Sequence, residues 1–382
     1  MLQTFLDAKP LYYEEIDYNR MPRVYESIRS RLRVPKIIHL IGTNGKGTTG
    51  RFLASALLSK GLSVGHYSSP HILEFNERIW LNGKNISNAA LESAHLELLT
   101  LLSPQDSEAL SYFEYTTFLA ILLYKECDYV VFEAGLGGEH DATSVFANIL
   151  TLITPIGRDH EAFLGDTIEK IATTKLRAIY KNAILAKQSQ SEVAVVARRL
   201  AEEKELNIES YEALLEAEDF DKIALISKNL SLAPYLEENL SLAIAALKFL
   251  GISYEVDSFK ESRLFGRLTQ LRENILLDVG HNELAAQEIV KSLKGQKFTL
   301  VYNSYKDKNY RAILETLSPI IEDIEILDVD ESRIENAQIM KKTVERLGFC
   351  YKKFEAINAE KRYLVFGSFS VAERFLKIYQ QK

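Results

Sequence analysis

The feature that most constrains this chain is a glycine-rich loop between a buried strand and a helix. The segment Gly42–Thr49 reads GTNGKGTT and follows the apolar run Lys36–Ile41, which predicts a buried strand. The segment Arg51–Lys60 predicts the helix that comes after the loop. Glycines let the backbone curl so that several N–H groups face one anion, and a helix N-terminus adds its partial positive charge. The loop therefore predicts a phosphate-binding site.

Side chains within this loop suit the same chemistry. Lys46 is placed to reach terminal phosphates, and the hydroxyl of Thr48 or Thr49 is placed to ligate Mg²⁺. The order differs from the usual G-x-x-x-x-G-K-[ST] because Gly47 separates the lysine from the threonines. The alternative is an ordinary glycine-rich turn. A strand before the loop and a helix after it favour phosphate binding.

Short apolar runs alternate with helical patterns along the whole chain. Further strands are predicted at 64–67, 129–132, 149–156, 183–186, 275–277, 298–302, 324–327 and 363–366, and helices at 114–125, 167–180 and 239–250. This alternation predicts an α/β fold: a P-loop ATPase-like domain with a mostly parallel sheet, and a smaller Rossmann-like α/β domain at the C-terminus. A polar stretch places the boundary near Glu255–Phe265, so the predicted domains are residues 1–260 and 261–382.

Composition limits the function classes. The formal charge of −7 over 382 residues argues against a dedicated nucleic-acid binder. Two distant cysteines, Cys127 and Cys350, form no disulfide framework or four-cysteine zinc site and suit a reducing compartment. We find no signal-peptide pattern at the N-terminus and no apolar run that approaches 18 residues. A cytoplasmic protein without a membrane span is therefore expected.

Chemically active residues follow several of the predicted strands. Ser69 follows the strand at 64–67, Glu133 closes the strand at 129–132, and His160 follows the strand at 149–156. Lys175 lies further on, in a helical pattern. Taken singly, each has an ordinary explanation as a cap, a core histidine or a solvated lysine. Taken together they describe a phosphoryl-transfer site, because Mg²⁺ and lysine neutralise the charge on a migrating phosphoryl group.

The motifs resemble, in content and in order, those of the folylpolyglutamate synthase/dihydrofolate synthase family of the Mur-ligase superfamily. The resemblance runs from about Ile16 to Phe369. The segments that carry it are GTNGKGT at 42–48, SSPH at 68–71 with NERI at 76–79, FEAGLGGEHD at 132–141, IGRDHEAFLG at 156–165 and DVGHN at 278–282.

The resemblance implies an ATP-dependent ligase of folate biosynthesis. ATP converts a pterin-linked carboxylate into an acyl phosphate, and the amine of L-glutamate displaces the phosphate to form an amide. The implied partners are dihydropteroate, reduced folates, L-glutamate and ATP, with Mg²⁺, and with neither nucleic acid nor membrane. A monomer is expected, and a need for K⁺ is left open. Activity on both dihydropteroate and reduced folate is the favoured interpretation.

The resemblance also assigns roles to individual residues. The ATP-binding residues are Gly45, Lys46, Gly47, Thr48, Asn239, Arg267 and Asp278, and the metal ligands are Ser69, Glu133 and His160. Lys46, His160 and Lys175 are the catalytic set, with Lys175 matching a lysine that the family carbamoylates. The substrate-binding residues are Asp17, Tyr18, Asn19, Tyr112, Phe113, His140, Asp141 and Ala142 on the pterin side, and His281 and Ser368 near the glutamate.

Some positions depart from the family pattern. Glu139 and His140 stand where the family usually has arginine and leucine, which we expect to alter the pterin or polyglutamate preference. Lys175 is flanked by Thr174 and Leu176 rather than glutamate and alanine.

Three other function classes share part of this pattern. A Mur-type ligase for peptidoglycan precursors shares the loop, but such enzymes usually carry a further N-terminal domain of roughly 100 residues. A P-loop kinase or GTPase explains the loop but not the second domain. A non-catalytic nucleotide-binding protein would be expected to lack Lys46 or Glu133.

Overall fold

The computed structural model describes residues 1–9 and 17–380, and their contacts divide into two compact units. The first unit comprises residues 1–157, 164–230 and 236–263, and the second comprises residues 158–163, 231–235 and 264–382. The segment 158–163 thus belongs to the second unit, although the chain on both sides of it belongs to the first. Ile16, where the family resemblance begins, lies outside the described residues.

The first unit is built on an eight-stranded sheet with the order β4-β3-β2-β5-β1-β6-β7-β8. Strands β2, β5, β1, β6, β7 and β8 are neighbours in this order, and each neighbouring pair is parallel. At the other edge, β3 pairs antiparallel with β2, and β4 pairs antiparallel with β3. Their bounds are β1 Lys36–Ile41, β2 Val64–Tyr67, β3 Ile79–Leu81, β4 Lys84–Asn85, β5 Tyr129–Glu133, β6 Leu150–Ile153, β7 Asn182–Leu185 and β8 Asn207–Ser210.

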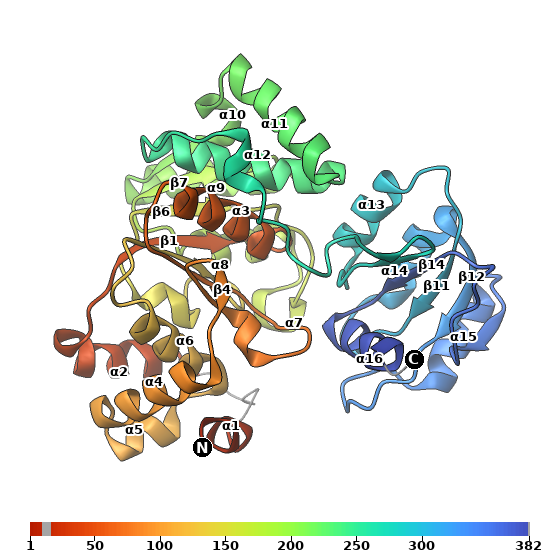
Figure 1. Ribbon diagram of the computed structural model, residues 1–382, viewed down its shortest axis with the longest axis horizontal. Coiled ribbons are helices and arrows are strands. Elements are labelled where there is room, and N and C mark those ends of the chain that lie inside the picture. Colours follow the sequence, from red (N-terminus) through yellow and green to blue (C-terminus); the bar gives the residue numbers. More distant parts are fainter. Residues whose placement is uncertain (10–16, 381–382) are drawn as a thin grey trace. The chain divides into compact units, whose positions relative to one another are not determined.

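Helices cover both faces of this sheet. Figure 1 shows α3 and α12 on one side of it and α4 and α6 on the other. The helices that begin in this part of the chain are α1 Leu2–Asp7, α2 Arg20–Ile28, α3 Lys46–Ser59, α4 Asn88–Leu101, α5 Pro104–Ala109, α6 Tyr112–Leu123, α7 Glu161–Leu164, α8 Ile168–Leu176, α9 Ser191–Lys204, α10 Tyr211–Leu214, α11 Ala217–Leu230 and α12 Pro234–Phe249. The central strands are apolar along their length because helices bury both of their faces.

The second unit holds a six-stranded sheet with the order β13-β12-β11-β14-β10-β9, parallel except for the β9–β10 pair. Its strands are β9 Thr269–Arg272, β10 Ile275–Leu277, β11 Phe298–Tyr302, β12 Ile321–Ile326, β13 Tyr351–Lys353 and β14 Tyr363–Phe366. Its helices are α13 Glu283–Ser292, α14 Tyr310–Leu317, α15 Ala337–Arg346 and α16 Phe369–Gln380. The predicted α/β fold with two mostly parallel sheets is confirmed.

Several predicted element boundaries were wrong, among them the ends of α6, α8, α12 and β12, and two have a clear local cause. Helix α3 begins at Lys46 rather than Arg51, because Gly45 takes a left-handed conformation and its carbonyl accepts the first helical bond, from Thr49 N at 2.9 Å. Strand β6 ends at Ile153 rather than Ile156, since Pro155 has no N–H to continue the ladder. No helix among residues 1–9 and 17–380 is long and apolar enough to cross a membrane.

Candidate active site

The glycine loop after β1 curls into the N-terminus of α3. Gly42 and Gly45 have φ angles of 138° and 90°, which residues with a Cβ rarely adopt. The backbone N–H groups of Thr43 and Asn44 both donate to the carbonyl of Pro155, at 2.9 and 3.3 Å. The loop is therefore anchored to the segment after β6, and it forms the anion-binding geometry expected at the N-terminus of a helix.

Lys46 and Glu133 lie together beside this loop. The Lys46 amine donates to the carbonyls of Gly42 and Thr43 at 3.3 and 3.2 Å, and it lies 3.8 Å from Glu133 Oε1. The other carboxylate oxygen of Glu133 accepts a hydrogen bond from Ser69 N at 3.2 Å. These residues meet because β2, β5 and β1 are neighbouring parallel strands, and parallel strands end at the same edge of a sheet.

The side chains at this edge suit a magnesium ion that is held partly by the protein and partly by the phosphates of a nucleotide. The Thr48 hydroxyl is buried and has no hydrogen-bond partner in the part of the chain that the structure describes. Within that part, no group of three or more His, Cys, Asp or Glu side chains forms a metal cage. Mg²⁺ is typically held by one or two carboxylates together with substrate phosphates and water, so Thr48 and Glu133 fit it.

Lys175, on α8, is buried against the same loop. Its amine donates to the Gly42 carbonyl at 2.8 Å, and the residue is 5% exposed. A Cβ on Gly138 would lie 2.4 Å from the Lys175 carbonyl oxygen, so only glycine permits this close approach. The loop after β5 thus packs directly on α8 and sets the lysine beside the phosphate loop. This lysine is the predicted carbamoylation site.

Asn239, on α12, meets the loop at Gly45. A Cβ on Gly45 would lie 2.3 Å from Asn239 Oδ1, and Asn239 is 5% exposed. The predicted ATP-binding residues of the first unit therefore gather around one loop, although Asn239 lies far from it in sequence.

Most of the predicted pterin-side residues contact another residue of the first unit. The rings of Tyr18 and His140 lie 4.4 Å apart, and a Cβ on Gly135 would meet the Phe113 ring at 2.7 Å. The guanidinium of Arg78 lies 5.3 Å from the centre of the Tyr112 ring. Asp17 Oδ1 accepts from Asn19 N at 3.0 Å, and this bond organises the turn before α2.

The charge of Glu139 is partly balanced by a neighbour. Arg177, at the end of α8, lies 3.3 Å from the Glu139 carboxylate. The replacement of arginine by glutamate therefore changes the local field less than the sequence alone suggested.

Asp141 organises its own loop. Its carboxylate accepts from Leu136 N at 2.8 Å and from Thr143 N and Oγ1 at 3.0 and 2.6 Å. Asp141 and Ala142 are 6% and 5% exposed, and burial raises the pKa of the Asp141 carboxyl. Of the predicted segment 140–142, only His140 is exposed. A substrate role for Asp141 and Ala142 stays a prediction.

Other predicted site residues lie in the second unit. Asp278 accepts from Tyr235 Oη at 2.9 Å, Leu268 N at 2.8 Å and Gly280 N at 2.8 Å. Arg267 lies over the Phe369 ring at 5.5 Å. Ser368 is 1% exposed, and its hydroxyl accepts a hydrogen bond from Val371 N at 3.1 Å. The Ser368 hydroxyl thereby caps the start of α16.

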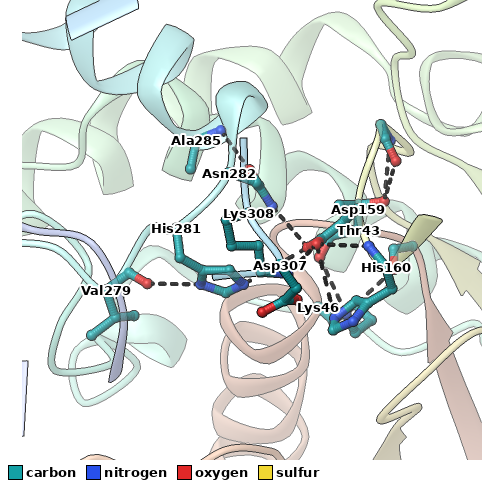
Figure 2. Close-up of polar contacts among 12 residues, drawn as sticks. Thr43, Lys46, Asp159, His160, Val279, His281, Asn282, Ala285, Asp307 and Lys308 are labelled. Atoms are coloured by element: carbon teal, nitrogen blue, oxygen red, sulfur yellow. Dashed lines mark hydrogen bonds and ion pairs between the residues drawn. The ribbon is translucent and has the colours of Figure 1, made fainter. Parts of the chain in front are cut away.

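A buried charged cluster surrounds Asp159 in the second unit. Figure 2 shows Lys308, Asn282 and His281 directed at the Asp159 carboxylate. Lys308 Nζ lies 2.5 Å from Oδ1, Asn282 Nδ2 donates to Oδ2 at 3.1 Å, and His281 Nε2 lies 3.7 Å from Oδ2. Burial by itself would raise the pKa of Asp159, but His281, His160 and Lys308 lower it well below its usual range. The carboxylate is therefore ionised.

Sequence reasoning missed Lys308 and the contact role of Asn282. Asp159 was noticed only as the neighbour of His160. The available signal was position: Lys308 lies in the polar segment that follows β11, just as the other site residues follow parallel strands. The predicted metal ligands are divided, with Ser69 and Glu133 in the first unit and His160 in the second.

Comparisons with known proteins agree on one family. A family model described as the Mur ligase middle domain matches residues 41–223. The chain is 30% identical to the dihydrofolate synthase/folylpolyglutamate synthase of Haemophilus influenzae, over 96% of this chain and 94% of that protein.

Solved structures give the same answer. The crystal structure of Helicobacter pylori folylpolyglutamate synthetase is 37% identical, with a TM-score of 0.79, covering 100% of this chain and 98% of that one. A bifunctional folylpolyglutamate synthase/dihydrofolate synthase from Yersinia pestis, complexed with AMPPNP and Mn, has a TM-score of 0.81 at 23% identity, covering 99% and 97%. At that identity the second likeness shows the fold alone.

Proposed function

The chain belongs to the dihydrofolate synthase/folylpolyglutamate synthase family, and we propose that it is the ATP-dependent ligase that joins L-glutamate to a pterin-linked carboxylate. The observation that carries the proposal is the close grouping of Lys46, Glu133 and the buried Lys175 around a left-handed glycine loop, in a chain that matches its relative almost end to end.

The reaction proceeds in two steps. An oxygen of the substrate carboxylate attacks the γ-phosphorus of ATP, the bond to the β-phosphate oxygen breaks, and ADP and an acyl phosphate form. The amine of L-glutamate then attacks the acyl carbon, phosphate leaves with the bonding electrons, and the amine loses a proton as the amide forms. Phosphorylation is required because a free carboxylate is a poor electrophile.

The chain's own residues position and neutralise charge. The loop N–H groups and the α3 N-terminus face the phosphates, and Lys46 moves from the Gly42 and Thr43 carbonyls to the terminal phosphate oxygens. Asn239 sits against the loop at Gly45, where the nucleotide is expected.

The metal assignment extends the proposal. Bound Mg²⁺ would offset the negative charge of the transferring phosphoryl group. Glu133 and Thr48 fit such an ion, while Ser69 and His160 are proposed as ligands from the sequence resemblance. Carbamoylation of Lys175, which would supply a further anionic group, and a requirement for K⁺ belong to the same proposal.

We favour activity on both dihydropteroate and reduced folate. Residues 1–260 would bind ATP, metal and pterin, and residues 261–382 would supply Arg267 and Asp278 to the nucleotide and His281 and Ser368 to glutamate. A monomer in the cytoplasm with small-molecule partners completes the proposal. The Mur-type alternative loses support, because the relatives described above are named as dihydrofolate or folylpolyglutamate synthases.

The decisive experiment measures ADP release with MgATP and L-glutamate, offering dihydropteroate and tetrahydrofolate separately and reading the product masses. A gain of one glutamate on both substrates supports the bifunctional ligase. A gain on one substrate alone excludes bifunctionality and directs attention to Glu139 and His140. No turnover on either would contradict the folate assignment and point back to another Mur-type substrate.

Lys46→Ala tests the phosphate site itself. We expect turnover to fall by at least about 10²-fold with the fold intact, because this lysine supplies charge rather than packing. Lys60→Ala, at the exposed far end of α3, is the matched control and should keep full activity. Near-native turnover of Lys46→Ala would show that the phosphate site lies elsewhere.

A further inference from the structure

The segment 158–163 contains a buried side chain, Asp159, that bonds to distant residues of the second unit. The chain before and after this segment belongs to the first unit. Within the segment, Asp159 accepts hydrogen bonds from Lys308 and Asn282, which lie more than a hundred residues further along the chain. These two bonds tie the segment to the second unit through the Asp159 side chain.

The partners of Asp159 are themselves fixed. The side chains of Asp159 and Lys308 are 7% and 6% exposed, so their ion pair is almost dry. Asn282 caps α13, because its Oδ1 accepts from Ala285 N at 2.9 Å while its Nδ2 donates to Asp159. Lys308 is the cation nearest the Asp159 carboxylate among the described residues, and asparagine supplies no charge. Lys308 is therefore the cation in direct contact with the Asp159 carboxylate, while His281 Nε2 lies further away at 3.7 Å.

The same carboxylate determines the backbone of His160. The φ angle of His160 is 52°, a left-handed conformation that is uncommon for residues other than glycine. Its N–H donates to Asp159 Oδ1 at 2.9 Å, the same oxygen that contacts Lys308. This local bond from an aspartate side chain to the following N–H stabilises the turn, and the turn sets the direction of the imidazole.

We propose that Lys308 is a positioning residue: it holds the Asp159 carboxylate, and through it the left-handed backbone that directs His160. The consequence for metal binding rests on the proposed function, in which His160 is a ligand. Lys308 acts on the metal only through Asp159 and His160, which separates it from the catalytic residues.

The test compares variants of the full-length protein at two levels. Hydrogen–deuterium exchange of peptides that span residues 158–163 reports on the anchor. Manganese affinity, measured by electron paramagnetic resonance with AMPPNP present, reports on the site. Lys308→Met removes the charge and keeps the length, Lys308→Arg restores the charge, and Lys306→Met is the control. Lys306 lies in the same loop, but it is exposed and its amine bonds to the Ser332 carbonyl.

We expect Lys308→Met to speed exchange in 158–163 by about five- to tenfold, the loss equivalent to one hydrogen bond. Lys308→Arg should restore slow exchange, and Lys306→Met should leave it unchanged. Manganese affinity should fall by about 10- to 100-fold in Lys308→Met, the usual effect of losing a group that orients a metal ligand.

The outcomes separate this inference from the proposed function. Unchanged exchange in Lys308→Met, or equal acceleration in Lys306→Met, overturns the positioning role. Faster exchange with unaltered manganese affinity supports the positioning role and removes His160 from the metal ligands. If Lys308→Met fails to fold because a buried carboxylate is left alone, Lys308→Met with Asp159→Asn removes both charges. Faster exchange in that double variant supports the role, and native exchange overturns it.

Discussion

Replacement of Gly42 by alanine tests why the phosphate loop needs glycine at its first position. With φ at 138°, a Cβ on Gly42 would lie 2.1 Å from Thr154 Oγ1 and 2.8 Å from the Thr154 carbonyl oxygen. The hydroxyl can rotate, but the carbonyl belongs to the backbone, which is held by Thr154 N bonded to Ile41 O at 2.9 Å. The methyl group therefore has no space without displacement of β6 from β1.

The size of the effect follows from two contributions. Backbone strain at a glycine-only φ costs about 1–3 kcal/mol, and overpacking costs about 1–3 kcal/mol, so the free energy of unfolding should fall by about 4 kcal/mol. Gly61→Ala is the matched control. Gly61 has φ of 77°, and a Cβ there would meet no described atom within 4 Å, so strain of about 1–2 kcal/mol is the whole effect.

The assay is urea unfolding followed by fluorescence of the single tryptophan. Trp80 lies on β3, is 5% exposed and belongs to the first unit, so its signal reports on the unit that contains both glycines. With a slope of about 3 kcal/mol per molar urea, a difference of about 2.5 kcal/mol separates the two midpoints by about 0.8 M. The reduced entropy of the unfolded chain is common to both variants and cancels. Equal midpoints would refute the steric argument at Gly42.

Two further predictions use the same fluorescence assay. Arg20→Met should lower the free energy of unfolding by about 3–5 kcal/mol, because it removes the guanidinium bonded at 2.8 Å to the Glu114 carboxylate, whose side chain is only 12% exposed. Arg23→Met, whose arginine is 61% exposed, should change it by less than about 1 kcal/mol, and similar losses in both variants would contradict the reasoning. The pH dependence follows from His39, because burial lowers its pKa to about 4. As the pH is lowered from 6.5 to 4, the unfolded chain takes up a proton on this histidine while the folded chain does not. The free energy of unfolding therefore decreases as the pH is lowered. His39→Gln lacks this component, so the stability advantage of the natural chain over His39→Gln should shrink by about 3 kcal/mol from pH 6.5 to pH 4, and a constant difference would disprove it.

Local pattern was sufficient where an element is both regular and buried. The run Lys36–Ile41 was predicted to the residue, because its β-branched side chains are covered on both faces and leave no other interpretation. Edge strands were missed for the opposite reason. The strands β8, β9 and β13 are short, half-exposed and polar, so their sequences do not differ from those of loops.

The candidate site shows the same division. Glu133 and Ser69 were predicted beside the glycine loop because parallel strands end at one edge of a sheet, and sequence order alone implies that edge. Lys308 was not predicted, since an isolated lysine in a polar loop is usually solvated. Lys308 is buried and pairs with Asp159, which lies 149 residues earlier in the chain, and the local sequence gives no sign of this contact.

The sequence by itself determined the strand–loop–helix unit that binds phosphate, the α/β class and the family, because each depends on short segments whose chemistry is legible residue by residue. Only the tertiary structure decided that residues 158–163 belong to the second unit and that Lys308 neutralises Asp159. Those features depend on which side chains, distant in sequence, are buried together in the folded protein. A buried charge without a partner costs free energy, so the buried Asp159 requires one. That pairing is a property of the folded chain, and local sequence patterns do not encode it.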